Sequence, residues 1–298
     1  MLRLTVLSAP LLGVFALSAC GSMTPASLAP KPAQAMLQNE TATPGAIKMV
    51  YILNYLSNTL TVDRANNGAL IRTISASLDN PSDLAVDHNG KIYVANQLGN
   101  TVTTYKPNGV PAVPTISARL SVPTGVTVGA TGKIYVTNQG NNTLTTYKSS
   151  GQRTTPTIHG LNEPGGVAVD AHGKIYVVNV ASNSVTTYLA NGTQTTPTIT
   201  IGLNAPTYIA VDSSGKIYVC NVAGNNVTTY NADGSQTTPT ITAGISSPFG
   251  LTVDAAGKIF VSNRGTGQVT TYLADGSQTT PTYTVPGDSG GAAGVAVN

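Results

Sequence analysis

The chain has 298 residues and a formal net charge of +3, and only 9% of its residues are charged. A hydrophobic share of 41% is enough for a folded core, which excludes a charged, intrinsically disordered chain. Lys and Arg form no run, which argues against nucleic acid as a partner, and two cysteines, Cys20 and Cys220, are too few for a zinc cluster or a disulfide framework.

The first twenty residues have the pattern of a secretion signal. Arg3 makes the start positive, and the apolar run over residues 4–17 is too short to span a bilayer of roughly 30 Å. The run ends in Leu-Ser-Ala-Cys at 17–20, which resembles the bacterial lipobox. We therefore expect a lipoprotein signal peptide over 1–19 and lipidation of Cys20; an ordinary signal peptide or a buried helix are the alternatives.

Lipidation of Cys20 implies an exported protein that a membrane holds through acyl chains. Gly21 and Ser22 follow the cysteine, with no Asp directly after it. In a Gram-negative cell this pattern resembles sorting to the outer membrane or its periplasmic face; in other cells it implies the cell surface. Residues 20–45, rich in Pro, Ala and Thr, are predicted to be the lipidated Cys and a flexible tether.

From residue 46 onward the chain repeats itself. A short segment of aromatic residue, two or more apolar or small residues and Asn recurs six times, and its aromatic residues are Tyr51, Tyr93, Tyr135, Tyr176, Tyr218 and Phe260. Their spacings are 42, 42, 41, 42 and 42 residues. A fixed period of this size is typical of a propeller or a solenoid.

Each repeat contains four short β-patterns and no helical spacing. The third complete repeat has Gly-Val-Ala-Val-Asp at 166–170, Lys-Ile-Tyr-Val-Val-Asn at 174–179, Ser-Val-Thr-Thr-Tyr at 184–188 and Thr-Pro-Thr-Ile-Thr at 196–200. Gly and Asn turns separate them. Four strands in about 42 residues make one propeller blade, with the first strand lining the central channel and the Pro-containing fourth strand on the outer edge.

The two ends of the repeat region predict how many blades there are. The first repeat lacks its inner strand, and the chain ends in Gly-Val-Ala-Val-Asn at 294–298, which matches that missing strand. We expect the C-terminal strand to complete the first blade and close the ring, because neither end looks like the cap of an open solenoid. The predicted fold over 46–298 is an all-β, six-bladed β-propeller of four-stranded blades.

The repeat Pro-x-Gly-Val-Ala-Val-Asp-x-x-Gly-Lys-Ile-Tyr-Val-x-Asn resembles the NHL repeat and its YVTN-type relatives. The resemblance covers residues 46–298 and implies a propeller with one binding face. On that face lie the loops between second and third strands and the loops that join blades. Six-bladed propellers of this kind include gluconolactonase-type lactonases, and a related seven-bladed architecture hosts a streptogramin lyase.

A recurrent asparagine is the first candidate feature of the binding face. It ends the second strand of every blade, as Asn54, Asn96, Asn138, Asn179, Asn221 and Asn263. A ring of amides offers hydrogen bonds to a polar ligand such as a glycan or peptide. The competing interpretation, which recurrence in every blade favours, is that each Asn caps its own loop.

Residues that break the repeat are the second candidate feature. On the loops between blades these are Asp83, His159, Glu163, Tyr208 and Phe249, and on the loops between second and third strands they are Tyr55, Gln97, Gln139 and Arg264. Aromatic rings with a few charges at a pore mouth are typical of a small-molecule or peptide site. Sequence drift on exposed loops is the competing explanation.

Enzyme chemistry has little support in the sequence. The three histidines form no metal-binding motif, so no metal, cofactor or catalytic residue is predicted. Blades with near-identical segments, as at 234–240 and 276–282, favour binding over the asymmetric acid–base site of an enzyme. We therefore expect a membrane-anchored binding or scaffold module for a protein, peptide or glycan; a lyase-like or lactonase-like enzyme and a structural envelope module are the alternatives.

Overall fold

The computed structural model describes residues 48–286 and 290–298. The chain divides into two units, Met1–Ala46 and Ile47–Asn298. The expected signal peptide (1–19), the lipidation site Cys20 and the tether (20–45) lie outside the described residues, so the fold below is that of the second unit. In this described part, no helix is long and apolar enough to cross a membrane.

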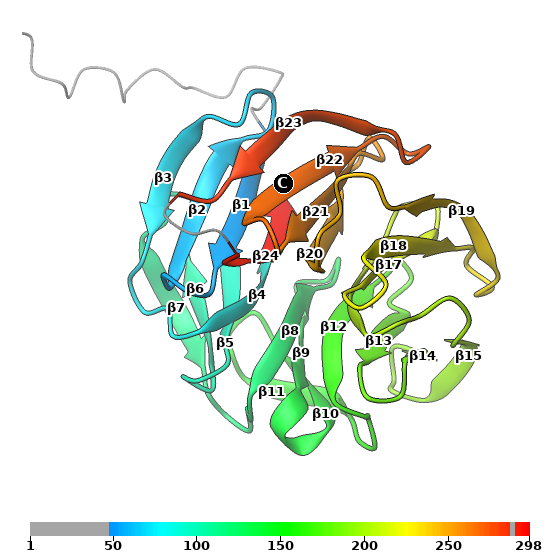
Figure 1. Cartoon of the computed structure of the whole chain (residues 1–298). Helices are drawn as coiled ribbons and strands as arrows, with labels where there is room; N and C mark the ends of the chain where they lie inside the picture. The colour runs from blue at the N-terminus through cyan, green and yellow to red at the C-terminus, as the bar shows by residue number, and fades with distance from the viewer. Residues whose placement is uncertain (1–47, 287–289) are drawn as a thin grey trace, which may run out of the picture. The chain divides into compact units, whose positions relative to one another are not determined.

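Six antiparallel sheets of four strands make up the described unit, and each sheet is one blade (Figure 1). The inner strands are β24 (Ala292–Val297), β4 (Pro81–Val86), β8 (Pro123–Val128), β12 (Pro164–Val169), β16 (Pro206–Val211) and β20 (Pro248–Val253). The second strands are β1 (Met49–Asn54), β5 (Ile92–Asn96), β9 (Ile134–Asn138), β13 (Ile175–Asn179), β17 (Ile217–Asn221) and β21 (Ile259–Asn263).

The third and fourth strands complete each blade toward the rim. The third strands are β2 (Thr59–Arg64), β6 (Thr101–Tyr105), β10 (Thr143–Tyr147), β14 (Ser184–Tyr188), β18 (Asn226–Tyr230) and β22 (Gln268–Tyr272). The fourth strands are β3 (Leu70–Ile74), β7 (Pro111–Ile116), β11 (Arg153–Ile158), β15 (Gln194–Ile199), β19 (Gln236–Ile241) and β23 (Gln278–Thr284), and a 3-10 turn, η1 (Gln139–Asn141), follows β9. The prediction of an all-β six-bladed propeller is confirmed.

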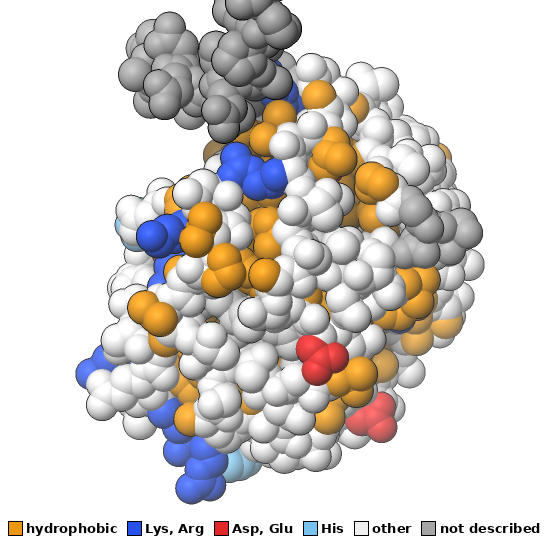
Figure 2. Space-filling view, turned by 90° about the vertical axis from the view of Figure 1, so that its left-hand side faces the viewer, with side chains coloured by type: hydrophobic (Ala, Val, Ile, Leu, Met, Phe, Trp, Pro, Cys, Tyr) orange, Lys and Arg blue, Asp and Glu red, His pale blue; other side chains and the backbone are white. Residues whose placement is uncertain are grey.

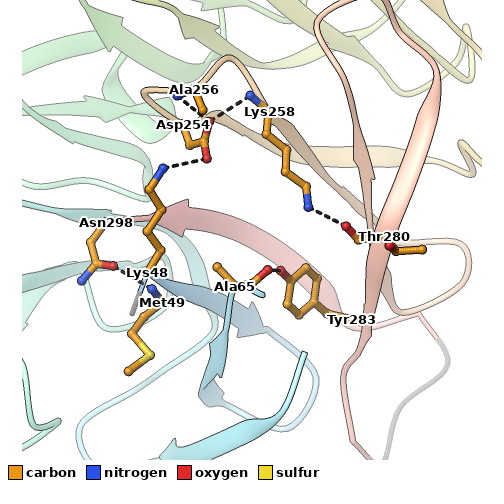
Figure 3. Close-up of polar contacts among 9 residues, drawn as sticks. All are labelled: Lys48, Met49, Ala65, Asp254, Ala256, Lys258, Thr280, Tyr283 and Asn298. Carbon is orange, nitrogen blue, oxygen red and sulfur yellow. Dashed lines mark hydrogen bonds and ion pairs between the residues drawn. The ribbon is translucent and has the colours of Figure 1, made fainter. Parts of the chain in front are cut away.

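Blade 1 is built from both ends of the propeller. Its strand order is β24-β1-β2-β3, so the red C-terminal strand lies beside the blue β1 in Figure 1. The two strands pair antiparallel, with Tyr51 opposite Ala296. At the end of this pair the Met49 N–H donates to Asn298 Oδ1 at 2.7 Å (Figure 3). The predicted closure by the C-terminal strand is therefore confirmed.

Further polar contacts join blade 1 to blade 6. Lys48 forms an ion pair with Asp254 at 3.0 Å, and the Tyr283 hydroxyl of β23 donates to the Ala65 carbonyl at 2.9 Å (Figure 3). These two contacts stabilise the junction between blade 1 and blade 6.

The third-strand tyrosine connects four of the blades to the loop that precedes each of them. The Tyr105 hydroxyl donates to the Ala76 carbonyl, 29 residues earlier, at 2.6 Å. The same bond recurs for Tyr147 with Ala118, Tyr230 with Ile201 and Tyr272 with Ala243. A buried phenol needs a partner for its O–H, and the repeat supplies one from the neighbouring blade.

We name the two faces of the propeller by their loops. The turn face carries the Asp-x-x-Gly turns between first and second strands, where Asp87 Oδ1 accepts the Asn89 and Lys91 N–H groups and Oδ2 accepts the Tyr93 hydroxyl. Asp87 therefore stabilises the turn between the first and second strands of its blade. The mouth face carries the loops between second and third strands and the loops between blades, because both leave their strands at the same end.

The recurrent asparagine holds these mouth-face loops together. Asn96 Oδ1 accepts the Asp79 N–H at 3.0 Å, and its Nδ2 donates to the Val94 carbonyl and to Thr103 Oγ1. Four later blades repeat the first bond, as Asn138 with Ser121, Asn179 with Asn162, Asn221 with Asn204 and Asn263 with Ser246. Each loop before a blade is therefore fixed to the blade that follows it.

The surface is poor in charge and carries some exposed apolar groups. Backbone and side chains that are neither charged nor hydrophobic cover most of the side seen in Figure 2, with Lys and Arg in separate small groups. On the mouth face, Leu56 and Leu98 are 52% and 71% exposed. Both lie on loops between second and third strands, in blades 1 and 2.

Candidate functional site

One position on the inner strands decides which side chains lie at the axis of the propeller. It is the third residue of each inner strand, occupied by Asp83, Gly125, Gly166, Tyr208, Gly250 and Gly294. The four glycines allow neighbouring inner strands to approach closely, since a Cβ on Gly125 would stand 2.7 Å from the Gly165 carbonyl oxygen. The asymmetry of the axis therefore comes from Asp83 of blade 2 and Tyr208 of blade 5. The prediction that Asp83, Tyr208 and Phe249 lie on loops between blades is wrong, because each inner strand begins at the Pro that precedes them.

Tyr208 reaches across the axis to blades 2 and 3. Its hydroxyl lies 2.9 Å from the Ser82 carbonyl and 2.8 Å from the Thr124 carbonyl, and both are acceptors. The ring has room because Gly166 lies beside it: a Cβ on Gly166 would stand 2.9 Å from Tyr208 Cα. Burial, and then the charge of Asp83, raises the pKa of Tyr208 well above its usual value, so the hydroxyl keeps its proton.

Tyr208 separates two cavities along the axis. A channel of about 190 Å³ is lined by inner-strand residues such as Val128 and Val169. A second cavity of about 230 Å³, which we call the mouth pocket, is lined by residues of the mouth face. Tyr208 lines both, so it forms the floor of the mouth pocket.

Arg264 is the charged group of the mouth pocket. Its guanidinium carbon lies 3.8 Å from the ring centroid of Phe249 and 4.2 Å from that of Tyr55, and the Phe249 and Tyr208 rings are 5.1 Å apart. Such cation–π contacts stabilise a desolvated guanidinium. Its Nε is buried without a hydrogen-bond partner among the described residues, and burial lowers the pKa of Arg264.

The rest of the pocket wall is amide, hydroxyl and apolar. Gln97 and Gln139 come from blades 2 and 3, and Val180 and Pro164 from blade 4. The pocket lining contains no histidine and no carboxylate among the described residues. Its chemistry is therefore one cation, two amides and apolar surface.

Asp83 is the buried carboxyl group of the axis. Its Oδ1 accepts the Leu84 N–H and its Oδ2 accepts the Val126 N–H, both at 2.8 Å. Burial raises its pKa to about 7, although both backbone hydrogen bonds oppose the shift. Asp83 lines the channel and not the mouth pocket, so it lies on the other side of Tyr208 from Arg264.

The structure brings five of the predicted site residues together and leaves others apart. Tyr208, Phe249, Arg264, Gln97 and Gln139 all line the mouth pocket. His159 and Glu163 are exposed on the loop between β11 and β12 and do not line it. The Glu163 N–H donates to Asn142 Oδ1 at 2.9 Å, and its carbonyl accepts the Val180 N–H, so its backbone holds the loop in place.

The asparagine candidates of the binding face have structural hydrogen bonds instead of free amides. Asn96, Asn138, Asn179, Asn221 and Asn263 are all buried, and each accepts a loop N–H and donates to groups of its own blade. The structure thus favours the loop-capping interpretation over a ring of ligand-binding amides. Their contribution to the site is to position the residues next to them.

Sequence reasoning gave too little weight to the residue after each asparagine. Tyr55, Gln97 and Gln139 break the repeat at this position, as does Arg264, and all four lie at the pocket or against its cation. The signal was present as variation at one fixed offset in an otherwise constant repeat. Only the ring of blades shows that these positions converge.

Other reactive side chains lie away from the pocket. His88 and His172 are exposed on the turn face, and among the described residues no three His, Cys, Asp or Glu side chains are placed to hold a metal ion. Cys220 is fully buried, and burial raises the pKa of its thiol, so this thiol is protonated and inaccessible.

The closed six-bladed ring with one asymmetric pocket at its mouth places this protein among the β-propellers of the NHL and YVTN type, as the repeat predicted. Within that class the family is narrower: residues 71–292 match the Virginiamycin B lyase family, and the chain belongs to it. A search of curated protein sequences gives no match.

Solved structures share the fold at low sequence identity. A streptogramin B lyase structure is 16% identical, with a TM-score of 0.64 over 83% of this chain and 82% of that one. A nidogen/laminin complex structure is 16% identical, with a TM-score of 0.72 over 84% of this chain and 98% of that one. A catalytically inactive histidine-to-alanine variant of virginiamycin B lyase from Staphylococcus aureus, with quinupristin, is 15% identical, with a TM-score of 0.61 over 85% and 89%.

The raised pKa of Asp83 predicts a pH dependence of stability. Because the folded-state pKa, about 7, exceeds the ordinary value of 3.8 for an aspartate, the folded protein binds this proton more tightly than the unfolded chain. The contribution of Asp83 is greatest below pH 4 and is lost as the pH rises through 7. Relative to Asp83→Asn, the free energy of unfolding should fall by on the order of 4 kcal/mol from pH 4 to pH 8.

Urea unfolding at pH 4, 6 and 8 measures this difference. Asp63, whose pKa is raised to about 6, acts in the same direction but is present in both proteins and cancels. Asp79→Asn, which removes an exposed carboxylate of the mouth face, is the control for the loss of one charge. Parallel pH profiles for the wild type and Asp83→Asn contradict the assignment.

Proposed function

We propose that this protein is an exported, lipid-anchored binding protein whose propeller holds a peptide, protein or glycan ligand at the mouth pocket. The observation that carries the proposal is the convergence of Tyr208, Phe249 and Arg264 on one cavity of about 230 Å³. A cation between aromatic rings provides orientation and contact area, which are the requirements of recognition. The exposed Leu56 and Leu98 on the same face add apolar contact area for a larger partner.

The described residues that line the pocket include no histidine or carboxylate for acid–base catalysis. General acid–base chemistry requires a titrating side chain within hydrogen-bonding reach of the substrate. All three histidines of the chain lie outside the pocket lining, and so does the buried Asp83. Binding therefore suits this pocket better than turnover.

Anchoring is the second part of the proposal, and sequence alone supports it. The apolar run 4–17 followed by Leu-Ser-Ala-Cys at 17–20 has the pattern of a lipoprotein signal, and residues 20–45 have the composition of a tether. In a Gram-negative cell the protein would reside on the outer membrane or at its periplasmic face, and in other cells on the cell surface.

Cell fractionation tests the anchor. The wild type is expected in the membrane fraction and should incorporate a labelled fatty acid, because the Cys20 thiol accepts the lipid. Cys20→Ala should lose the label and leave the membrane fraction. Cys220→Ala, at a position where blade 2 has Ala95, is the matched control and should behave like the wild type. Labelling of Cys20→Ala at the wild-type level contradicts the proposal.

Capture of a ligand tests the mouth pocket. After cross-linking on intact membranes, mass spectrometry of the purified protein should identify a partner with the wild type and with Arg119→Gln, which alters an exposed arginine of the same face. Arg264→Gln should reduce the yield of that partner about tenfold or more, since it removes the pocket's charge. An equal yield with Arg264→Gln excludes this pocket as the binding site, and no partner in any sample favours a structural envelope module.

The enzyme alternative rests on membership of the Virginiamycin B lyase family. Incubation with quinupristin, the compound in one of the similar structures, decides it directly. We expect the compound to remain intact by liquid chromatography and mass spectrometry, because the described residues that line the pocket include no histidine or carboxylate to move a proton. Cleavage of quinupristin at a rate that depends on protein concentration, and that His159→Ala abolishes, would instead establish a lyase.

A further inference from the structure

The residues that follow the recurrent asparagine form a ring of equivalent positions, which we call the mouth ring. Its members are Tyr55, Gln97, Gln139, Val180, Val222 and Arg264. The backbone N–H of every member donates to a carbonyl of a mouth-face loop, at distances between 3.0 and 3.2 Å. Six backbones are thus held alike while the side chains vary among Tyr, Gln, Val and Arg, which is the arrangement of a specificity-determining surface.

The polar side chains of the mouth ring are available to a ligand. The hydroxyls of the pocket wall are already used, since Thr124 donates to the Pro164 carbonyl and Thr207 to the Pro248 carbonyl. In the parts of the chain that the structure describes, the side-chain amides of Gln97 and Gln139 and the guanidinium of Arg264 make no hydrogen bond. Three uncommitted polar groups therefore line one small cavity.

Arg264 restricts the ligand to one direction of approach. The guanidinium carbon lies 3.8 Å from the ring centroid of Phe249 and 4.2 Å from that of Tyr55, so a ligand must approach the guanidinium from a direction that these two rings do not block. A ligand in the pocket meets the N–H groups at the edge of the guanidinium plane. Parallel hydrogen bonds from such an edge match the two oxygens of a carboxylate.

The charge and the wall residues of the pocket further limit the chemical class of the ligand. Arg264 forms no ion pair with a described residue, so a ligand with one negative charge would balance the pocket. Gln97 and Gln139 each supply a donor and an acceptor, which together match the C=O and N–H of an amide. Val180, Pro164 and Phe249 suit a short apolar side chain better than a sugar ring covered with hydroxyls.

We propose that the mouth pocket binds an N-acyl α-amino carboxylate, with the carboxylate on Arg264, the acyl amide on Gln97 and Gln139, and the side chain against Val180 and Phe249. This chemical group occurs in free N-acyl amino acids and at the C-terminus of a peptide. The inference rests on the proposed binding function and specifies the ligand class for the same pocket.

Calorimetric titration of the full-length protein in detergent tests the ligand class. The probes are N-acetyl-alanine and N-acetyl-leucine, their carboxamide counterparts, and glucuronate and inorganic phosphate as anions of other classes. The N-acetyl amino acids should bind at least tenfold more tightly than their carboxamides and than glucuronate or phosphate, because only they match all three polar groups.

Variants assign each part of the ligand to a side chain. Arg264→Gln should abolish the preference for acid over carboxamide, while Arg119→Gln retains it. The double variant Gln97→Ala/Gln139→Ala should still bind carboxylates but lose the preference for N-acetyl-alanine over propionate. Thermal unfolding of each variant within a few degrees of the wild type verifies that the fold is kept.

A peptide probe distinguishes a free N-acyl amino acid from the C-terminus of a peptide as the natural ligand. A tetrapeptide with a free C-terminus that binds more tightly than N-acetyl-leucine, and loses this affinity on amidation, identifies a peptide terminus; equal or weaker binding identifies the free acyl amino acid. Equal binding of acids and carboxamides, tighter binding of glucuronate or phosphate, or no binding of any probe overturns the inference. If a membrane partner still depends on Arg264 in that case, the proposed function stands and only the ligand class is wrong.

Discussion

The pairing of the first and last strands of the propeller is the constraint on which the rest of the structure depends. β24 completes blade 1 by pairing with β1, so each blade has a neighbour on both sides. Closure brings the inner strands of all six blades around one axis and the mouth-face loops around one opening. An open array of the same blades would keep neighbouring contacts but lose every contact across the ring, including that of Tyr208 with blades 2 and 3.

Repetition and its exceptions have separate roles in this molecule. The repeated residues make the scaffold: Asn96 and its equivalents hold the loops, and Tyr105 and its equivalents join the blades. The exceptions lie where the scaffold leaves side chains free to vary, at the third residue of each inner strand and after each recurrent asparagine. A nearly symmetric protein therefore acquires one asymmetric pocket without altering its blades.

The residues of the mouth pocket favour binding, whereas the name of the family refers to an enzyme. The chain belongs to the Virginiamycin B lyase family, but the similar lyase structures are only 15–16% identical and establish a shared fold. At the mouth of the axis this chain places an arginine, aromatic rings and amides. A propeller fold supports many functions, so the chemistry of the pocket is the better guide to what this member does.

The sequence alone determined the number of blades, the order of their strands, the closing strand and the face on which the loops gather. These features depend on local residue patterns and on the period of the repeat, and both can be read directly from the sequence. It also marked Tyr208, Phe249 and Arg264 as exceptions to the repeat. Only the tertiary structure decided that Tyr208 forms the pocket floor and that Arg264 lies between Phe249 and Tyr55. Contacts between residues as far apart as Ser82 and Tyr208 depend on the radius of the closed ring and the direction of each side chain, which no local pattern encodes.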